Sequence, residues 1–184
     1  EESRASRFAT EELARRFIMA HGCLRILLAS RLGCTPAEVP LELGTMGKPC
    51  LSEGPCFNLS HSGELAAVII SPHGEVGVDV EKVRPFPGMD EVAEHVFSAE
   101  ERRWMQQGRD PVRRFFRCWV LREAVVKALG FGLAFSLKRF SLVMPLEYGA
   151  PVAVRGEIPC RIKLREWSPA PDFTGAAAVF YPSH

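Results

Sequence analysis

Long apolar runs are missing from this sequence. The longest, LAAVII (65–70) and AAAVFY (176–181), fall far short of the roughly 18 residues that a membrane-spanning helix needs. No secretory signal pattern opens the chain, and its six cysteines include no Cys-x-x-Cys pair. These absences exclude a membrane-spanning helix and argue against zinc and thiol-redox motifs. We expect a cytoplasmic protein with reduced thiols and no disulfide bonds.

Lysine is scarce as well. Of the 23 cationic residues, five are lysines and eighteen are arginines, against 22 acids. The net charge of +1 excludes a whole-molecule basic field for nucleic acid. Arginine favours bidentate contact with phosphate or carboxylate, although a high-GC genome would produce the same bias. With 184 residues, 47% of them hydrophobic, the chain has the composition of one globular domain, or of two small ones packed together.

The pattern of apolar residues indicates an α+β fold with strands mostly joined by hairpins. Helical spacing predicts a helix over residues 8–32, capped by Thr10 and stopped by Gly33. Further helices are predicted over 90–107 and 111–129. Strands are predicted near residues 57–62, 64–71, 76–83, 135–144, 161–167 and 174–182. The likeness of GELAAVIIS (63–71) to TGAAAVFYP (174–182) is a weak hint of internal duplication.

Two acids stand close together in one predicted strand, VGVDVEKV (76–83). Asp79 and Glu81 are two residues apart, so their carboxylates project from the same face, beside the open space expected at Gly77. Like charges at this spacing repel one another unless a cation lies between them, or unless water screens them at a sheet edge. An all-oxygen pair suits Mg²⁺ or Mn²⁺ better than zinc. A solvated edge and a metal site both remain open.

Other polar residues are ambiguous when each is taken alone. Glu123 lies four residues before Lys127 in the predicted helix 111–129, which is typical of an ordinary surface ion pair. His61, in FNLSHS (57–62), would by itself be interpreted as a structural histidine.

Five motifs in order resemble the 4′-phosphopantetheinyl transferases, and within them the larger, monomeric, surfactin-synthetase-activating type. They are GKP (47–49), FNLSHS (57–62), VGVDVEKVRP (76–85), FSAEE (97–101) and WVLREAVVKALGFGL (119–133). The helix signature W-x-x-[K/R]-E-A-x-x-K-x-x-G, at its distance after GVDVE, is the most specific of them. The resemblance implies a pseudo-twofold fold of two similar α+β halves, residues 1–84 and 85–184, with the active site between them.

The resemblance also implies a set of ligands. A divalent cation, Mg²⁺ or alternatively Mn²⁺, would be held by Asp79, Glu81 and Glu123. Coenzyme A would be the substrate, and the family's contacts to it carry over to Arg4, Arg16, Lys48, Ser60, His61 and Lys127.

The implied reaction moves the 4′-phosphopantetheine arm of coenzyme A to a serine of an apo acyl or peptidyl carrier protein. The products are the holo carrier protein and 3′,5′-ADP. Glu123, or a water that it holds, is the candidate base, and Glu101 is a second candidate for orienting that water or the helix. Lys127 and His61 would stabilise charge on the pyrophosphate during direct transfer. A metal-dependent phosphohydrolase and a protein that only binds coenzyme A or carrier proteins are the alternatives.

The sequence departs from the family pattern at two positions, and one of its segments is a candidate docking surface. Arg122 stands where relatives usually have lysine, and His21 stands where they are often basic or polar. The run 102–117 carries six arginines around Trp104 and Met105, which we expect to be exposed. This run is either a docking surface for an acidic, helical carrier protein or a set of solvated helix faces. We expect a monomer that binds neither nucleic acid nor membrane.

Overall fold

The computed structural model describes residues 8–44, 47–130, 139–145, 147–156 and 161–181. The elements along the chain are α2 (Glu11–Leu32), β1 (Glu42–Leu43), β2 (Pro49–Cys50), β3 (Cys56–Ser62), β4 (Leu65–Ser71), β5 (Val76–Lys82), α3 (Met89–Val96), α4 (Ala99–Gln106), α5 (Pro111–Leu129), β6 (Phe140–Val143), β7 (Ala153–Gly156), β8 (Arg161–Trp167) and β9 (Phe173–Tyr181). The mixture of helices with antiparallel strand pairs confirms the predicted α+β class.

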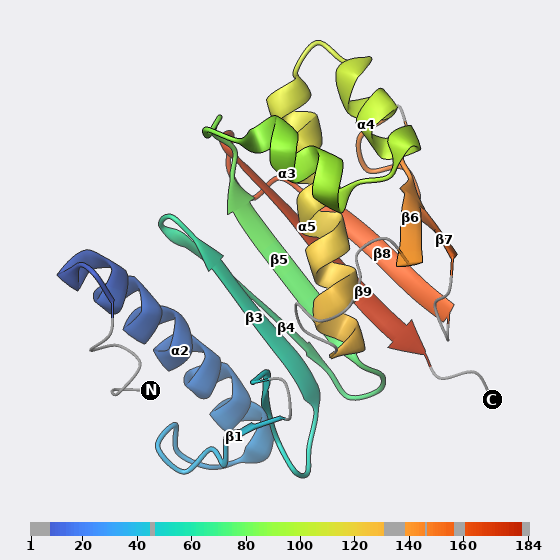
Figure 1. Ribbon diagram of the computed structural model, residues 1–184. Helices are drawn as coiled ribbons and strands as arrows, with labels where there is room; N and C mark the ends of the chain where they lie inside the picture. The colour runs from blue at the N-terminus through green and yellow to red at the C-terminus, as the bar shows by residue number, and fades with distance from the viewer. Residues whose placement is uncertain (1–7, 45–46, 131–138, 146, 157–160, 182–184) are drawn as a thin grey trace.

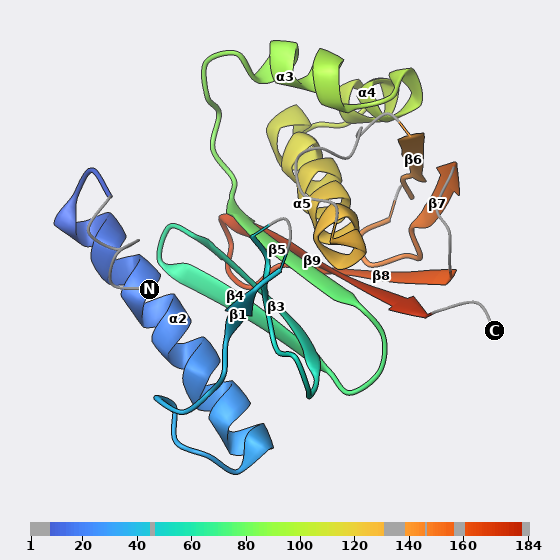
Figure 2. The same cartoon turned by 60° about the horizontal axis from the view of Figure 1, so that its bottom comes forward.

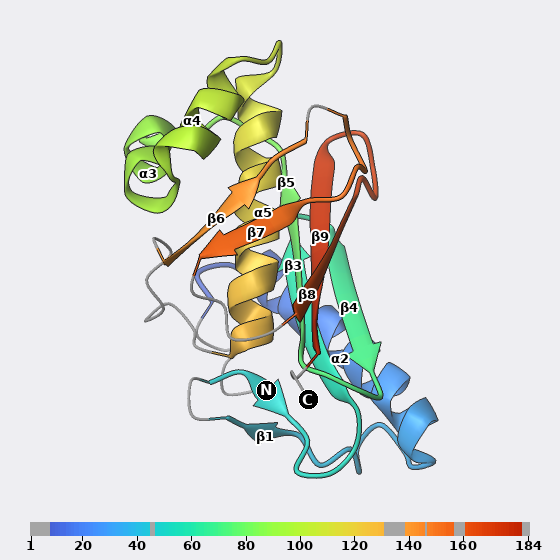
Figure 3. The ribbon, with the colours of Figure 1, turned by 90° about the vertical axis from the view of Figure 1, so that its right-hand side faces the viewer.

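Two layered units make up the fold. In one, α5 lies across a three-stranded antiparallel sheet of order β5-β9-β8 (Figure 1). In the other, α2 lies along the β3–β4 hairpin (Figure 2). The β6–β7 pair flanks α5 on the side away from α2 (Figure 3). Because alternate strand residues face the helices, each unit buries its own apolar cluster beneath its own helix.

The first long helix begins and ends as the sequence predicts. The Thr10 hydroxyl accepts a hydrogen bond from the Leu13 amide at 3.3 Å, which satisfies one of the free amides at the helix start. Gly33 ends α2 in the left-handed conformation, with φ of 70°. A residue without a side chain adopts that conformation at little cost.

Helix α5 packs closely on β5, and Gly77 makes this possible. A Cβ atom at Gly77 would lie 2.1 Å from the Ala124 carbonyl oxygen and 2.4 Å from the Ala128 amide nitrogen. The expectation of open space beside the strand acids is therefore wrong, because the backbone of α5 fills it. The close approach brings Lys127 of α5 against Asp79 of β5.

The predicted division at residue 84 falls in the segment between β5 and α3. Strand β5 precedes this boundary but pairs along its length with β9, near the end of the chain. The division into residues 1–84 and 85–184 stays a prediction.

From the sequence we expect neither a membrane-spanning helix nor a disulfide bond. Within the described ranges, no helix is long and apolar enough to cross a membrane. The cysteines that the structure describes are all free: Cys23, Cys34, Cys50, Cys56 and Cys118.

Candidate active site

Asp79 lies at the centre of the polar residues between β3, β5 and α5. Its Oδ1 atom accepts hydrogen bonds from the Ser60 hydroxyl at 2.7 Å and from the Lys127 ammonium at 2.6 Å. Its Oδ2 atom is buried and has no hydrogen-bond partner in the described part of the chain. Burial raises the pKa of Asp79, while Lys127, Ser60 and, least, the Val80 backbone amide act in the opposite direction. One carboxylate oxygen is thus committed, and the other is buried and unsatisfied.

Glu81 and Glu123 belong to the same electrostatic cluster. The Glu81 carboxylate accepts a hydrogen bond from the Ser62 hydroxyl at 2.7 Å. Burial is the largest cause that raises the pKa of Glu81, and the negative charge of Asp79 adds to it. The pKa of Glu123 is also raised, first by burial and next by the charge of Asp79, with a smaller contribution from Glu81. The strand acids and the helix acid therefore lie close enough to feel one another's charge.

The donor set of these acids suits a hard divalent cation. Carboxylate oxygens are the ligands that Mg²⁺ and Mn²⁺ prefer, and the buried Oδ2 of Asp79 is an acceptor that only a cation or a donor would satisfy. However, no group of three or more Asp, Glu, His or Cys side chains among the described residues is arranged to hold a metal ion. The acids fit the chemistry of the metal but do not form a closed cage.

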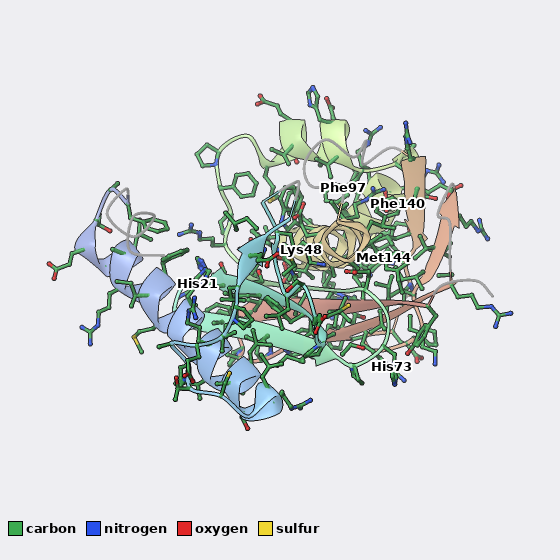
Figure 4. All side chains as sticks on the ribbon, turned by 90° about the horizontal axis from the view of Figure 1, so that it is seen from below. His21, Lys48, His73, Phe97, Phe140 and Met144 are labelled. Atoms are coloured by element: carbon green, nitrogen blue, oxygen red, sulfur yellow. The ribbon has the colours of Figure 1, made fainter. Side chains whose placement is uncertain are left out.

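Two lysines lie against the backbone of β5. Besides Asp79, the Lys127 ammonium contacts the Val78 carbonyl oxygen at 3.3 Å. The Lys48 ammonium donates to the Val76 carbonyl oxygen at 3.1 Å and to the Glu75 carboxylate at 3.2 Å. Both lysines therefore approach the edge of β5 that β9 leaves uncovered. Lys48 lies on the side of α5 toward α2, opposite Phe140 and Met144 (Figure 4).

Ser60, expected to contact a coenzyme A phosphate, has its hydroxyl engaged within the protein. The side chain is buried, donates to Asp79, and lies 3.2 Å from the Lys127 ammonium and 3.4 Å from the Val80 amide. A hydroxyl has one proton and two lone pairs, so these three contacts use its full capacity. A phosphate contact through this hydroxyl would require one of them to break.

The histidines gather with Phe17 where α2 faces β3. The His61 ring meets the Phe17 ring edge-on at 6.4 Å, and the His21 ring lies 4.2 Å from Phe17 between centroids. They line a cavity of about 200 Å³ with residues of the GKP segment. Partial burial and the positive charge of Lys127 lower the pKa of His61, so its neutral form is favoured.

The two arginines expected at the nucleotide differ in what the structure describes. Arg16, on the first turns of α2, pairs with Glu12 at 2.5 Å. The pKa of Glu64 is lowered mainly by a hydrogen bond from its own backbone amide and next by Lys82, and the charge of Arg16 makes the smallest contribution. Arg4 lies outside the described residues.

Glu101 is buried and saturated by hydrogen-bond donors. Its oxygens accept from the Arg122 guanidinium at 2.6 and 3.1 Å, from the Leu142 amide at 2.9 Å and from the Ser98 amide at 2.7 Å. Of the two roles expected for Glu101, orientation of a helix agrees with this geometry and orientation of a water does not. Arg122 also donates to the Phe140 carbonyl oxygen, which ties α5 to β6.

The prediction that Trp104 and Met105 are exposed beside the arginines of residues 102–117 is wrong. Trp104 is 7% exposed and Met105 5%, because α4 turns both side chains toward an aromatic cluster with Phe115. Arg117 is buried as well and pairs with Glu166 at 2.6 Å. The alternation of arginines and apolar residues here reflects a helix packed on one side.

Sequence reasoning missed Ser62 and Asn58. Both lie on β3, on the same face as Ser60, and both hydrogen-bond to β5. The available signal was the alternation of polar residues at positions 58, 60 and 62, which places three hydrogen-bonding side chains on one side of a strand.

Part of the chain matches a known protein family. Residues 75–176, which include all three acids and Lys127, match the model of the 4′-phosphopantetheinyl transferase superfamily. The match covers more than half of the chain, which therefore belongs to this superfamily.

Two curated relatives illustrate the likeness. The chain is 36% identical over 139 residues to the 4′-phosphopantetheinyl transferase HetI of Nostoc sp., which covers 72% of this chain and 59% of HetI. It is 39% identical over 126 residues to the 4′-phosphopantetheinyl transferase AcpT of Salmonella typhi, which covers 66% of this chain and 63% of AcpT. The chain thus spans about three fifths of the length of these relatives.

A solved structure supports the fold. A holo-(acyl-carrier-protein) synthase from Bacillus anthracis, in complex with CoA (3′,5′-ADP), superposes with a TM-score of 0.51 over 59% of this chain and 96% of that chain. At 18% sequence identity this likeness shows the fold alone.

Proposed function

We propose that this protein transfers the 4′-phosphopantetheine arm of coenzyme A to a serine hydroxyl of an apo acyl or peptidyl carrier protein. The products are the holo carrier protein and 3′,5′-ADP. The observation that carries the proposal is the meeting of Asp79 and Lys127 at 2.6 Å, with Glu81 and Glu123 within range of their charges. This arrangement lies inside the segment that matches the superfamily.

The metal proposal follows from the donor set. Asp79, Glu81 and Glu123 would hold Mg²⁺, or alternatively Mn²⁺, and the unsatisfied Oδ2 of Asp79 supports this assignment. When bound, such a cation offsets negative charge on a pyrophosphate. The substrate itself would supply further oxygen ligands, which is consistent with a site that the protein side chains do not close.

Two residues of the protein would assist the transfer, one by accepting a proton and the other by offsetting negative charge. The serine oxygen forms a bond to the phosphorus that carries the pantetheine arm while the bond from that phosphorus to the 3′,5′-ADP oxygen breaks. Glu123, or a water that it holds, would take the proton of the serine. Lys127, whose ammonium is partly exposed, would offset the negative charge left on 3′,5′-ADP.

Coenzyme A would lie against β5 and the α2 face. Lys48 is proposed for the nucleotide phosphates and neutral His61 as a hydrogen-bond donor to a phosphate oxygen. Arg16 and Arg4 are proposed for the 3′-phosphate and adenine. Ser60 would act indirectly, by holding Asp79 and Lys127 in place.

The subtype and setting are also proposals. The motif order and the two-halves interpretation favour the larger, monomeric, surfactin-synthetase-activating type. The free thiols suit a reducing compartment such as the cytoplasm. The carrier protein would come from fatty acid, polyketide or non-ribosomal peptide synthesis.

Mass spectrometry tests the function. The protein is incubated with coenzyme A, Mg²⁺ and a panel of apo acyl and peptidyl carrier proteins. Transfer adds the phosphopantetheine mass to a carrier, hydrolysis frees phosphopantetheine into solution, and binding alone does neither. An unchanged mass for every carrier in the panel would contradict the proposal.

A pair of variants tests the acid site in the same assay. Asp79→Ala should abolish transfer, whereas Asp90→Ala, at an exposed position in the first turn of α3, should retain it. Circular dichroism confirms that both variants are folded. Full turnover by Asp79→Ala would remove this residue from the site.

A further inference from the structure

One edge of β5 is covered by side chains rather than by a strand. Strand β9 pairs with the other edge, so β5 is an edge strand of the three-stranded sheet. On the uncovered edge, the Val78 amide donates to Asn58 Oδ1 at 2.8 Å and the Lys82 amide to the Ser62 hydroxyl at 3.1 Å. Between them, the Val80 amide lies 3.4 Å from the Ser60 hydroxyl. Side chains of β3 therefore do what the carbonyl groups of a neighbouring strand would do.

The register explains the alternation of polar residues in β3. Each of the three contacts joins residues 20 positions apart in the sequence. The constant offset means that β3 runs parallel to β5. Because alternate residues of a strand face the same side, one polar residue in every two along β3 meets every second amide of β5. This set of three contacts is called the edge ladder below.

Two of the three ladder contacts continue to an acid. The Ser60 hydroxyl donates to Asp79 Oδ1 and the Ser62 hydroxyl donates to Glu81 Oε2, both at 2.7 Å. Each serine hydroxyl therefore accepts a hydrogen bond from a β5 amide and donates one to the acid that precedes this amide in the sequence. Asn58 makes a ladder contact of the same kind, but among the described residues it forms no hydrogen bond with an acid.

Glu81 depends on its serine more than Asp79 does. Asp79 also contacts the Lys127 ammonium, whereas Ser62 supplies the one hydrogen bond that Glu81 accepts within the described residues. Glu81 is also the less buried of the two. Without the Ser62 hydroxyl, its longer side chain would gain rotamer freedom, and its carboxylate would no longer be aimed beside Asp79.

We propose that Ser62 is a positioning residue for Glu81, and that the edge ladder sets the direction of both strand carboxylates relative to the β5 backbone. The inference rests on the proposed metal-dependent transfer, because it assigns the purpose of that direction to holding the cation. The first residue of the ladder, Asn58, would serve the joint between β3 and β5 alone.

Binding of Mn²⁺ tests the proposal without any catalytic turnover. Isothermal titration calorimetry measures Mn²⁺ affinity for the full chain in the presence of saturating coenzyme A and in the absence of carrier protein, with a titration of coenzyme A alone subtracted. Ser62→Ala should weaken Mn²⁺ binding about 10- to 100-fold, the usual cost of losing a partner that orients a metal ligand. Ser62→Thr keeps the hydroxyl and should recover most of the affinity.

Asn58→Ala is the matched control, with Asn58→Ser as a milder form if the alanine variant does not fold. Either should lower the thermal midpoint but leave Mn²⁺ affinity unchanged, because this contact reaches no carboxylate. Amide hydrogen exchange adds a local readout: Ser62→Ala should expose the Lys82 amide, and the Asn58 variants should expose the Val78 amide.

Three results would overturn the proposal. They are wild-type affinity for Mn²⁺ in Ser62→Ala, an equal loss of affinity in the Asn58 variants, and no Mn²⁺ uptake by the wild-type chain. If instead the Mn²⁺ series behaves as expected and no carrier protein gains mass, the positioning role stands and the proposed transfer fails.

Discussion

Helix α5 carries two cations that each meet a carboxylate from another element, and the two pairs differ in what they leave unsatisfied. Arg122 and Glu101 are paired at 2.6 Å with side chains 1% and 0% exposed. Lys127 and Asp79 are also paired at 2.6 Å, but their side chains are 28% and 4% exposed. Both oxygens of Glu101 are saturated by donors, whereas Oδ2 of Asp79 has no partner in the described part.

The contrast separates an ion pair that builds the fold from one that is available to a ligand. A saturated, buried pair has no free acceptor, so Glu101 and Arg122 serve to join α4, α5 and β6. A pair with a free oxygen and an accessible ammonium attracts a cation on one side and an anion on the other. The proposed Mg²⁺ ion and the pyrophosphate group of coenzyme A would supply this cation and this anion.

The largest effect is expected for the buried pair of Arg122 and Glu101. Arg122→Ala leaves the Glu101 carboxylate buried without its cation and should lower the free energy of unfolding by about 3–5 kcal/mol, measured by urea denaturation. The double variant Glu101→Gln with Arg122→Met should be closer to wild type, since no charge is then buried and the glutamine side chain still offers an acceptor to the Leu142 amide. A loss below about 1 kcal/mol in Arg122→Ala would contradict the assignment.

The close contact of α5 with β5 comes next. Gly77→Ala places a Cβ against the α5 backbone and should cost about 1–3 kcal/mol, because the helix must move away from the strand. Transfer should fall as well, since the same movement separates Lys127 from Asp79. Gly22→Ala on α2, where a Cβ meets no atom within 4 Å, is the control and should stabilise by about 0.5–1 kcal/mol. Equal unfolding midpoints for the two variants would refute the steric argument.

Lys127→Met tests the partly exposed pair of Lys127 and Asp79. It leaves Asp79 without its ammonium, but water reaches part of this site, so the expected loss is about 1–2 kcal/mol. Transfer to a carrier protein should fall by about 10²–10³-fold, the usual cost of losing a charge-stabilising group. Steady-state kinetics and urea denaturation together measure the two effects. A large stability loss with intact kcat would mean that this pair, like that of Arg122 and Glu101, stabilises the fold and does not serve the transfer.

The smallest effect is expected for a surface pair. Lys82 and Glu64 lie 3.3 Å apart with both side chains well exposed. Glu64→Gln should leave the urea midpoint unchanged within error at physiological salt, because water and ions screen exposed pairs. A shift as large as that of Lys127→Met would mean that exposure does not separate the pairs.

Local patterns predicted much of the fold. Thr10 and Gly33 bound α2 as expected, because capping depends on neighbours a few residues away. The alternation in β5 predicted a strand with Asp79 and Glu81 on one side, and the superfamily motif predicted that Glu123 and Lys127 would join them. These are properties of one element at a time, or of a motif specific enough to identify a family.

The errors arose where two elements meet. Gly77 was interpreted as open space, but α5 occupies it, and no periodicity within β5 reveals a helix 47 residues later in the sequence. Trp104 and Met105 were placed on the surface because arginines surround them, while the structure turns them inward. Amphipathic patterns show that a helix has two faces, but the packing partner decides which face is covered.

By itself, the sequence determined the long helices and strands of this protein, its superfamily and the types of residue available for chemistry, because these follow from local conformation and motif order. It predicted one helix over residues 90–107, where the structure has two, α3 and α4, and it did not predict the short strands β1, β2 and β7. Only the tertiary structure decided which carboxylate is saturated, which oxygen is left without a partner, and that side chains of β3 replace a strand along β5. Hydrogen bonds and ion pairs depend on distances of about 3 Å between atoms, and folding sets those distances between residues far apart in the chain.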